Sequence, residues 1–276
     1  MATEILAAGL GEKRAASTAA GGTALSTTAT FIQLPLGTRT ITILPRNLST
    51  AVVAQWSANP WLVVLKTTDN MVKPPTDYSK EAQDADAATD IDVSELSTIA
   101  NGDFLLIGSH QRIRGAYIDM DGTNGVGTAT MQAAYWDGSG WTSHGTLSDG
   151  TNAGTRVFEQ DGIVTWDVPT REAWKMASLR QMFPNFANAN PSHPLLDLPL
   201  YWTRIGVSAA LTDTSVTMNS LVAANRSTAY LELIAGQPWE ERVQFGEIGG
   251  IGCIEAKVNA GTGNLIVNVA TERGGE

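Results

Sequence analysis

Residues 200–211 read LYWTRIGVSAAL, and this stretch decides the fold class. Its aromatic and β-branched residues alternate, so that every second residue from Tyr201 to Leu211 shares one face of a strand. Further segments of strand length precede it: FLLIG (104–108), RIRGAYIDM (112–120), TATMQAAYW (128–136) and GIVTWDV (162–168). Asp-Gly pairs, which are strong hairpin signals, lie between or beside them at 121–122, 137–138, 149–150 and 161–162. Strands joined by turns predict an all-β fold of antiparallel β-sandwich or jelly-roll units.

The composition agrees with this fold and excludes several classes of protein. Only 17% of the 276 residues are charged, against roughly 25% in a typical soluble domain, yet 43% are apolar, so the low charge does not indicate disorder. The net charge of −10 disfavours binding to nucleic acid or to an anionic membrane. The opening residues MATEILAAGL lack the basic start of a signal peptide, and no segment has the roughly 18 apolar residues of a membrane span. We expect synthesis and folding in a cytoplasm, with no nucleic-acid or membrane partner.

Changes in composition and hydrophobic pattern along the chain predict its domains. Residues 1–24 are mostly Ala, Gly, Ser and Thr and are expected to form a flexible N-terminal arm. Residues 25–75 carry strand signals and are expected to form a first β unit. The polar, acidic stretch 76–100 is expected to be a connecting loop. It leads to a β-sandwich domain over 101–225, and a C-terminal β segment over 226–276 is expected to complete the first unit.

Three segments carry more specific expectations. Ile41 and Ile43 alternate with threonines, which predicts a strand with one buried face. The last strand, NLIVNVA (264–270), either pairs within the chain or is donated to a neighbour. The segment REAWKMASLRQMF (171–183) has few helix breakers and places Trp174, Ala177 and Leu179 near helical spacing. It is expected to form one short helix, followed by the Pro- and Asn-rich loop PNFANANPSHP (184–194).

Motifs for catalysis and for cofactor binding are absent from the sequence. There is no HExxH, CxxC, GxSxG or P-loop motif, and the three histidines, His110, His144 and His193, lie in different segments and are expected at the surface or at an interface. Cys253 lies in the apolar stretch GGIGCIEAKV, where a buried small side chain is favoured over a nucleophile. We therefore predict no enzymatic activity and no cofactor.

Two sets of residues remain as candidate binding sites. Asp119, Asp121 and Asn124 supply hard oxygen ligands on one short turn and are candidates for calcium, although the same residues also suit an ordinary hairpin connection. Trp136, Trp141 and Trp202 are candidate interface or glycan-binding aromatics, since exposed aromatic rings stack on sugars and anchor protein interfaces. Adjacent aromatics on a strand point to opposite faces, so one member of each pair is expected in the core.

Three of these segments together resemble a known β-sandwich module. They are YWDGSGWT (135–142), FEQDGIVTWDVP (158–169) and LYWTRIGVSAALTDTSVTMNSL (200–221). The series is similar to a module of virion structural proteins of tailed bacteriophages. In that module a Tyr-Trp strand leads into a Gly/Ser turn, a G-x-V-x-(F/W) strand ends in Pro, a Trp-containing helix follows, and a YW-x-R strand runs toward a Thr-rich hairpin. The resemblance covers about residues 100–225, under half of the chain.

The resemblance implies a non-enzymatic part of a phage particle, with the virion as its location and with no catalytic residues to carry over. Its partners would be further copies of itself and other virion proteins, either the major capsid protein or tail and neck proteins. It does not choose between a capsid-decorating or cementing role and a neck or tail role. The alternative is a carbohydrate-binding module of a tail tip or fibre that attaches to a host glycan. A sugar-cleaving depolymerase is disfavoured because the sequence has no internal repeat.

Overall fold

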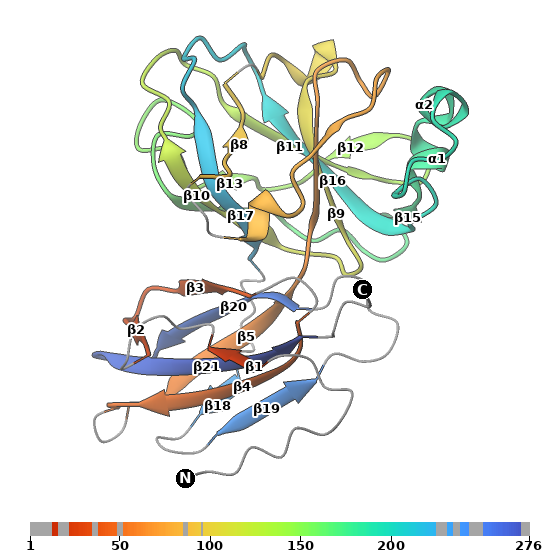
Figure 1. Ribbon diagram of the computed structural model, residues 1–276. Coiled ribbons are helices and arrows are strands. Elements are labelled where there is room, and N and C mark those ends of the chain that lie inside the picture. Colours follow the sequence, from red (N-terminus) through yellow and green to blue (C-terminus); the bar gives the residue numbers. More distant parts are fainter. Residues whose placement is uncertain are drawn as a thin grey trace. The chain divides into compact units, whose positions relative to one another are not determined.

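The computed structural model describes residues 13–15, 22–34, 38–48, 52–84, 88–94, 96–224, 231–233, 238–242 and 251–271. The chain forms two compact units, one made of Met1–Trp61 with Ser227–Glu276 and the other of Leu62–Arg226 (Figure 1). Each unit contains two sheets, and every pairing between named strands is antiparallel. The predicted all-β sandwich fold is confirmed.

The first unit combines strands from both ends of the chain. One of its sheets has the order β1-β21-β4-β19, with β2 also paired to β21; the bounds are β1 (Lys13–Ala15), β2 (Thr23–Leu25), β4 (Thr38–Arg46), β19 (Trp239–Arg242) and β21 (Gly263–Thr271). The other has the order β18-β5-β20-β3, with β3 (Thr30–Gln33), β5 (Ala54–Pro60), β18 (Leu231–Leu233) and β20 (Ile251–Val258). Apolar side chains from both sheets form one core.

The central pairing of this unit follows the alternation seen in the sequence. Ile41 and Ile43 are fully buried and lie opposite Val269 and Val267 of β21. The last strand therefore pairs within the chain. It lies between β4 on one side and β1 and β2 on the other, so β21 is an interior strand of its sheet. Of the expected N-terminal arm, residues 1–12 and 16–21 lie outside the described residues, whereas β1 and β2 belong to this sheet.

The second unit is a sandwich of a five-stranded and a seven-stranded sheet. The first has the order β13-β14-β10-β17-β8, with β8 (Ile91–Asp92), β10 (Gly115–Gly122), β13 (Ser148–Asp149), β14 (Gly162–Thr165) and β17 (Thr217–Ala223). The second has the order β12-β11-β16-β9-β6-β7, with β6 (Val63–Thr67), β7 (Thr76–Asp77), β9 (Phe104–Ser109), β11 (Met131–Trp136), β12 (Trp141–Ser143) and β16 (Leu200–Val207); β15 (Met176–Ala177) also pairs with β16. The core between the sheets contains Leu105 and Ile205 from one and Ile118 and Leu221 from the other.

The predicted boundary between the units is wrong. The division falls after Trp61, because the next strand, β6, pairs with β9 of the second unit. The acidic stretch 76–100 is not a connection but part of the same sandwich. Its strand β8 pairs with β17, and apolar residues within it join the core: Ala82, Ile91, Val93 and Leu96. Two 3-10 turns, Glu81–Gln83 and Ile99–Asn101, lie before and after β8.

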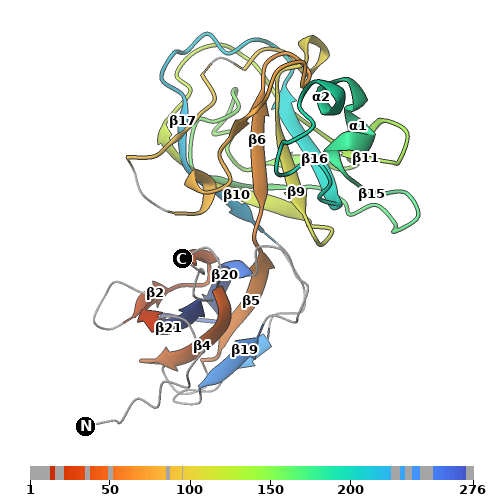
Figure 2. The ribbon, with the colours of Figure 1, turned by 45° about the vertical axis from the view of Figure 1, so that its right-hand side comes forward.

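The outer face of the seven-stranded sheet is covered over β9 and part of β16. All six residues of β9 are buried, which requires cover on both faces of the sheet because successive side chains point in opposite directions. Two short helices, α1 (Leu179–Met182) and α2 (Pro184–Ala189), lie beside β15 and β16 (Figure 2). Several side chains of this segment are buried outside the core between the sheets: Leu179, Met182, Phe183, Phe186 and Leu196.

The single helix predicted over 171–183 is therefore corrected in position and number. Residues 171–173 form a turn, and Met176–Ala177 pairs with β16, because tertiary hydrogen bonds outweigh the local helical spacing. Trp174 is buried and donates its indole N–H to the carbonyl of Trp202. The helix begins after Ser178, whose hydroxyl and the side chain of Gln181 form a capping box. A second helix starts with Pro184 at its first position, within the predicted loop.

Candidate functional site

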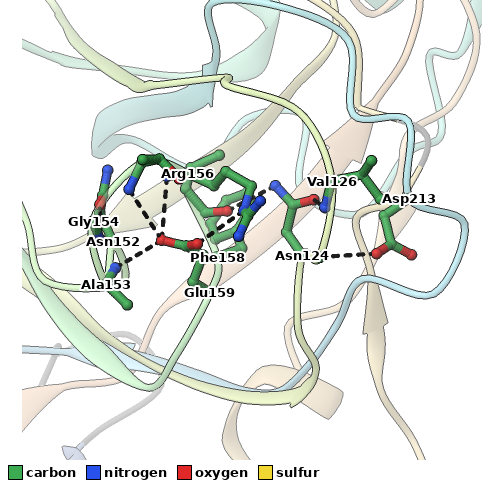
Figure 3. A network of polar contacts seen from close by, with 12 residues as sticks. Asn124, Val126, Asn152, Ala153, Gly154, Arg156, Phe158, Glu159 and Asp213 are labelled. Carbon is green, nitrogen blue, oxygen red and sulfur yellow. Dashed lines mark hydrogen bonds and ion pairs between the residues drawn. The ribbon is translucent and has the colours of Figure 1, made fainter.

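The turn that carries the calcium candidates uses its polar atoms for internal contacts (Figure 3). Asn124 is buried; its amide nitrogen donates to the carbonyl of Val157 at 3.0 Å, and its amide oxygen accepts the backbone N–H of Val126 at 3.3 Å. The neighbouring Gly125 donates its N–H to the carboxylate of Asp213 at 2.9 Å. The oxygen of Asn124 thus holds the turn together, which is the structural alternative that the sequence left open.

The two carboxylates of the predicted calcium site have separate surroundings. Asp119 accepts a hydrogen bond from the side-chain amide of Asn219 at 2.7 Å. Asp121 lies beside Asp90, and desolvation together with the carboxylate of Asp121 raises the pKa of Asp90. Across the described part of the chain, no three His, Cys, Asp or Glu side chains are placed to hold a metal ion. The geometry therefore does not favour calcium at Asp119, Asp121 and Asn124.

A second loop in the same region is organised by one carboxylate. Glu159 accepts backbone N–H groups from Ala153 at 2.9 Å and from Arg156 at 3.2 Å, and it forms an ion pair with the Arg156 guanidinium at 2.8 Å (Figure 3). Phe158 beside it is fully buried in a left-handed backbone conformation with φ of 62°. These contacts fix the loop around the Glu159 carboxylate.

His144 lies in the interior and not at the surface or an interface. Its Nε2 atom is 3.1 Å from the hydroxyl of Thr203, and its ring is surrounded by Tyr135, Trp166 and Trp174. Burial lowers the pKa of His144 to about 4, so the ring is neutral at pH 7. The aromatic residues of the two sheets create this environment, which no local motif around His144 indicates.

Cys253 also has a structural environment. Its thiol is buried in β20, as predicted, and the amide of Asn59 lies 3.7 Å from the sulfur. Burial raises the pKa of the thiol, which disfavours the nucleophilic thiolate.

The three candidate tryptophans occupy different environments. Trp202 is fully buried and donates its indole N–H to the carbonyl of Ala177 at 2.7 Å, so it offers no face for a ligand. Its inclusion among the binding aromatics was wrong, because the segment beside α1 covers the outer face on which Trp202 lies. Trp136 and Trp141 face each other across the β11–β12 hairpin and are both partly exposed. Their ring centroids are 5.5 Å apart in an edge-to-face arrangement.

Strand parity separates Trp136 from its neighbour. Tyr135 packs against the core between the sheets, with its ring 5.1 Å from that of His144. Trp136 therefore points to the opposite, outer face of the sheet, together with its cross-strand partner Trp141. One member of this aromatic pair lies in the core, as the sequence predicts.

Arg204 lies beside these rings on the outer face. Thr203 and Ile205 point inward, so Arg204 points outward, between Ala134 and Leu106 of the adjacent strands. Its guanidinium carbon lies 5.0 Å from the ring centroid of Trp141 and 5.6 Å from that of Phe104. We refer to Phe104, Trp136, Trp141 and Arg204 as the Arg204 cluster.

The charge of Arg204 is partly withdrawn from water. Its Nε atom is buried and has no hydrogen-bond partner, and the side chain forms no ion pair with any residue that the structure describes. Desolvation lowers the pKa of Arg204, although a guanidinium remains charged at neutral pH. No motif around Arg204 indicates a binding role. The available signal was its place two residues after Trp202 on a strand that alternates between two faces.

A groove lies on the opposite face of strand β16 from Arg204. It has a volume of about 330 Å³ and is lined by Arg171, Glu172, Trp174, Lys175, Met176 and Tyr201, which we call the Tyr201 groove. Tyr201 shares the parity of the core residue Ile205, so the groove and the Arg204 cluster face opposite ways. The ring of Tyr201 packs edge-to-face on Trp174, with centroids 5.9 Å apart.

The polar side chains of the groove are mostly basic. Lys175 and Arg171 are exposed beside it, whereas Met176 is an exposed apolar side chain. The pKa of Glu172 is lowered because its carboxylate accepts hydrogen bonds from its own backbone and from the side chain of Thr170, and because Lys175 lies nearby. A groove lined by aromatic rings and by charged side chains suits a small polar ligand.

The Arg204 cluster and the Tyr201 groove both offer surfaces suited to noncovalent binding.

Within the described residues, no helix has the length and the apolar character needed to cross a bilayer. Searches against protein-family models, curated proteins and solved structures found no match for this chain.

Proposed function

We propose that this protein is a non-enzymatic structural component of a tailed-phage virion, which assembles as an oligomer or in many copies through protein–protein contacts. The observation that carries the proposal is the Arg204 cluster. Trp and Arg are the residue types most enriched among the side chains that dominate binding energy at interfaces, and here they lie together on a rigid sheet. A partly exposed cluster of this kind fits a surface that another protein covers.

Two further features support the proposal. The three segments that resemble phage virion modules all fall in the second unit, and two of them, the hairpin Tyr135–Thr142 and the segment that contains β16, carry Trp136, Trp141 and Arg204 of the cluster. The edge strands of both sheets in this unit have only two or three residues: β7, β8, β12 and β13. Short edges discourage strand addition, so contacts with partners would use side-chain surfaces.

The proposed partners are further copies of this chain and other virion proteins, either the major capsid protein or tail and neck proteins. Copy number distinguishes the positions. A stained gel of purified particles that shows hundreds of copies would indicate capsid decoration or cementing, and about 3 to 12 copies would indicate a neck or tail ring. Absence of the protein from purified particles would contradict the proposal.

A variant links the cluster to assembly. Trp141→Ala removes a ring of the size that costs 2 kcal/mol or more at interface hot spots, which corresponds to a loss of about 30-fold in affinity. We expect its incorporation into particles to fall at least tenfold. Met176→Ala is the matched control, because Met176 is an exposed apolar side chain in the Tyr201 groove. Equal incorporation of both variants would show that the cluster is not an assembly surface.

The second candidate function is carbohydrate binding by a tail-tip or fibre module that attaches to a host glycan, and the Tyr201 groove is the observation that favours it. Tyr201 supplies an aromatic surface, and Lys175 and Glu172 supply hydrogen-bonding groups at the rim. A glycan array at high protein concentration tests this function. Binding that Tyr201→Ala abolishes and Trp141→Ala retains would place the sugar in the groove, and a blank array would count against it.

A further inference from the structure

Arg204 is a partly buried cation without a counter-ion. Its cross-strand neighbours on the outer face, Ala134 and Leu106, are apolar, and the structure gives it no carboxylate partner among the described residues. The other members of the Arg204 cluster are uncharged rings. The faces of Phe104 and Trp141 stabilise the guanidinium, but no carboxylate among the described residues neutralises it, so its charge is available to a partner.

The surrounding rings hold the guanidinium in one orientation. Phe104 is fully buried, and the guanidinium carbon lies within 5.6 Å of its ring centroid and 5.0 Å of that of Trp141. The Nε atom is buried and unpartnered, whereas the two terminal nitrogens are not sealed from solvent. The cluster therefore presents the outer edge of a planar guanidinium, whose terminal N–H groups match the two oxygens of a carboxylate.

From this geometry we propose that the Arg204 cluster is a receptor for a carboxylate of a partner protein, an Asp or Glu side chain that pairs with the exposed edge of Arg204 beside Trp136 and Trp141. This inference rests on the proposed function and names the chemistry of the partner. A single cation matches the charge of one carboxylate. Acidic residues outnumber basic ones by 28 to 18 in this chain, so further copies of it offer such groups. The partly exposed tryptophans would exclude water from the pair once the partner is seated.

A titration of the full-length protein with sodium acetate tests the site directly. Nuclear magnetic resonance would follow the indole N–H signals of Trp136 and Trp141 and the Nε–H signal of Arg204, with sodium chloride at equal ionic strength as the reference. We expect saturable shifts with acetate that disappear in Arg204→Met. The control Arg114→Gln removes the same charge from an exposed position and should leave the shifts unchanged. No response to acetate, or a stronger response to inorganic phosphate, would overturn the assignment of a carboxylate.

Thermal melting of the isolated protein separates a binding role from a structural one. Methionine preserves the length and the apolar stem of the side chain and removes the unpaired charge, so Arg204→Met should melt at the same temperature as the original protein or higher. Arg204→Lys keeps the charge without the planar fork and should bind acetate more weakly. A fall of several degrees in Arg204→Met would show that the arginine is held for stability and would overturn the proposal.

Particle incorporation distinguishes failure of this inference from failure of the proposed function. If acetate binds but Arg204→Met enters particles normally, the carboxylate site stands and its role in assembly is wrong. If acetate does not bind but Arg204→Met is excluded from particles, the assembly surface stands and the carboxylate assignment is overturned.

Discussion

The imidazole of His144 stacks on the indole of Trp166, with ring centroids 4.8 Å apart and planes inclined by 26°. Tyr135 and Trp174 contact the same imidazole from the seven-stranded sheet and from the segment after Pro169. The neutral imidazole thereby contacts aromatic rings from several segments of the second unit. The free energy of unfolding of that unit therefore depends on whether His144 is protonated.

The first prediction concerns pH. The folded protein lowers the pKa of His144 from 6.5 to about 4, so between these values the unfolded chain binds more protons than the folded one. The contribution of the neutral ring is fully present above pH 6.5 and is lost as the pH falls toward 4. For His144 alone, the free energy of unfolding should drop by about 2 kcal/mol between pH 7.5 and pH 5.

Urea unfolding at the two pH values measures this drop. His144→Gln keeps a polar group toward Thr203 but does not titrate, so it isolates the histidine from the carboxylates that also titrate. Its loss of stability over this pH range should be smaller by about 2 kcal/mol. An equal loss in both proteins would show that His144 is not the responsible group.

The second prediction compares a buried tryptophan with a partly exposed one on the outer face. Trp202→Ala removes a fully buried ring and its hydrogen bond to Ala177, and it should lower the free energy of unfolding by about 3–5 kcal/mol. Trp136→Ala removes a partly exposed ring and should cost clearly less. Denaturant unfolding of both variants checks the order, and a reversed order would contradict the burial assigned to Trp202.

The third prediction concerns a glycine in β9. A Cβ atom on Gly108 would lie 2.6 Å from the Trp202 ring and 2.7 Å from a methyl group of Leu200. Gly108→Ala should therefore destabilise the protein by about 1–3 kcal/mol through overpacking. Gly140→Ala is the matched control, since a Cβ atom there meets nothing within 4 Å. Similar melting temperatures for the two variants would refute the close packing at Gly108.

The fourth prediction concerns the turn at Asn124. Asn124→Ala leaves the buried carbonyl of Val157 without its donor and should destabilise the fold by about 1–3 kcal/mol, with or without calcium. Asp121→Asn, the control, should change stability much less. Thermal melting with and without millimolar calcium checks both variants. A calcium-dependent rise in melting temperature that Asp121→Asn abolishes would restore the metal-site hypothesis.

Period-two patterns predicted the strands because a strand with one buried face must alternate. Ile41, Ile43, Val267 and Val269 all point into the first core. The Asp137-Gly138 pair forms the loop of the β11–β12 hairpin, with the Asp137 carboxylate accepting the N–H groups of Ser139 and Gly140. The other Asp-Gly pairs lie at strand ends, such as Gly162 at the start of β14.

Local patterns failed where a distant partner decides the structure. The acidic stretch 76–100 has the composition of a loop, but a few apolar residues such as Ile91 and Val93 anchor it in the core. The helical spacing of Trp174, Ala177 and Leu179 was overridden when Trp174 found its hydrogen-bond partner on β16. Trp202 was a candidate for an exposed binding aromatic, yet it is fully buried and bonded to Ala177 in the segment beside α1.

By itself, the sequence determined the all-β class, the faces of its alternating strands and the absence of motifs for cofactor chemistry, because these depend on residue type and on spacing within a few residues. Only the tertiary structure decided which part of the outer face of the seven-stranded sheet stays open. Exposure depends on what another segment covers, so Trp202 became part of the interior while Trp136 and Trp141 remained at the surface. The same packing placed Arg204 against two aromatic rings that come from other strands, a contact that no spacing along the chain encodes.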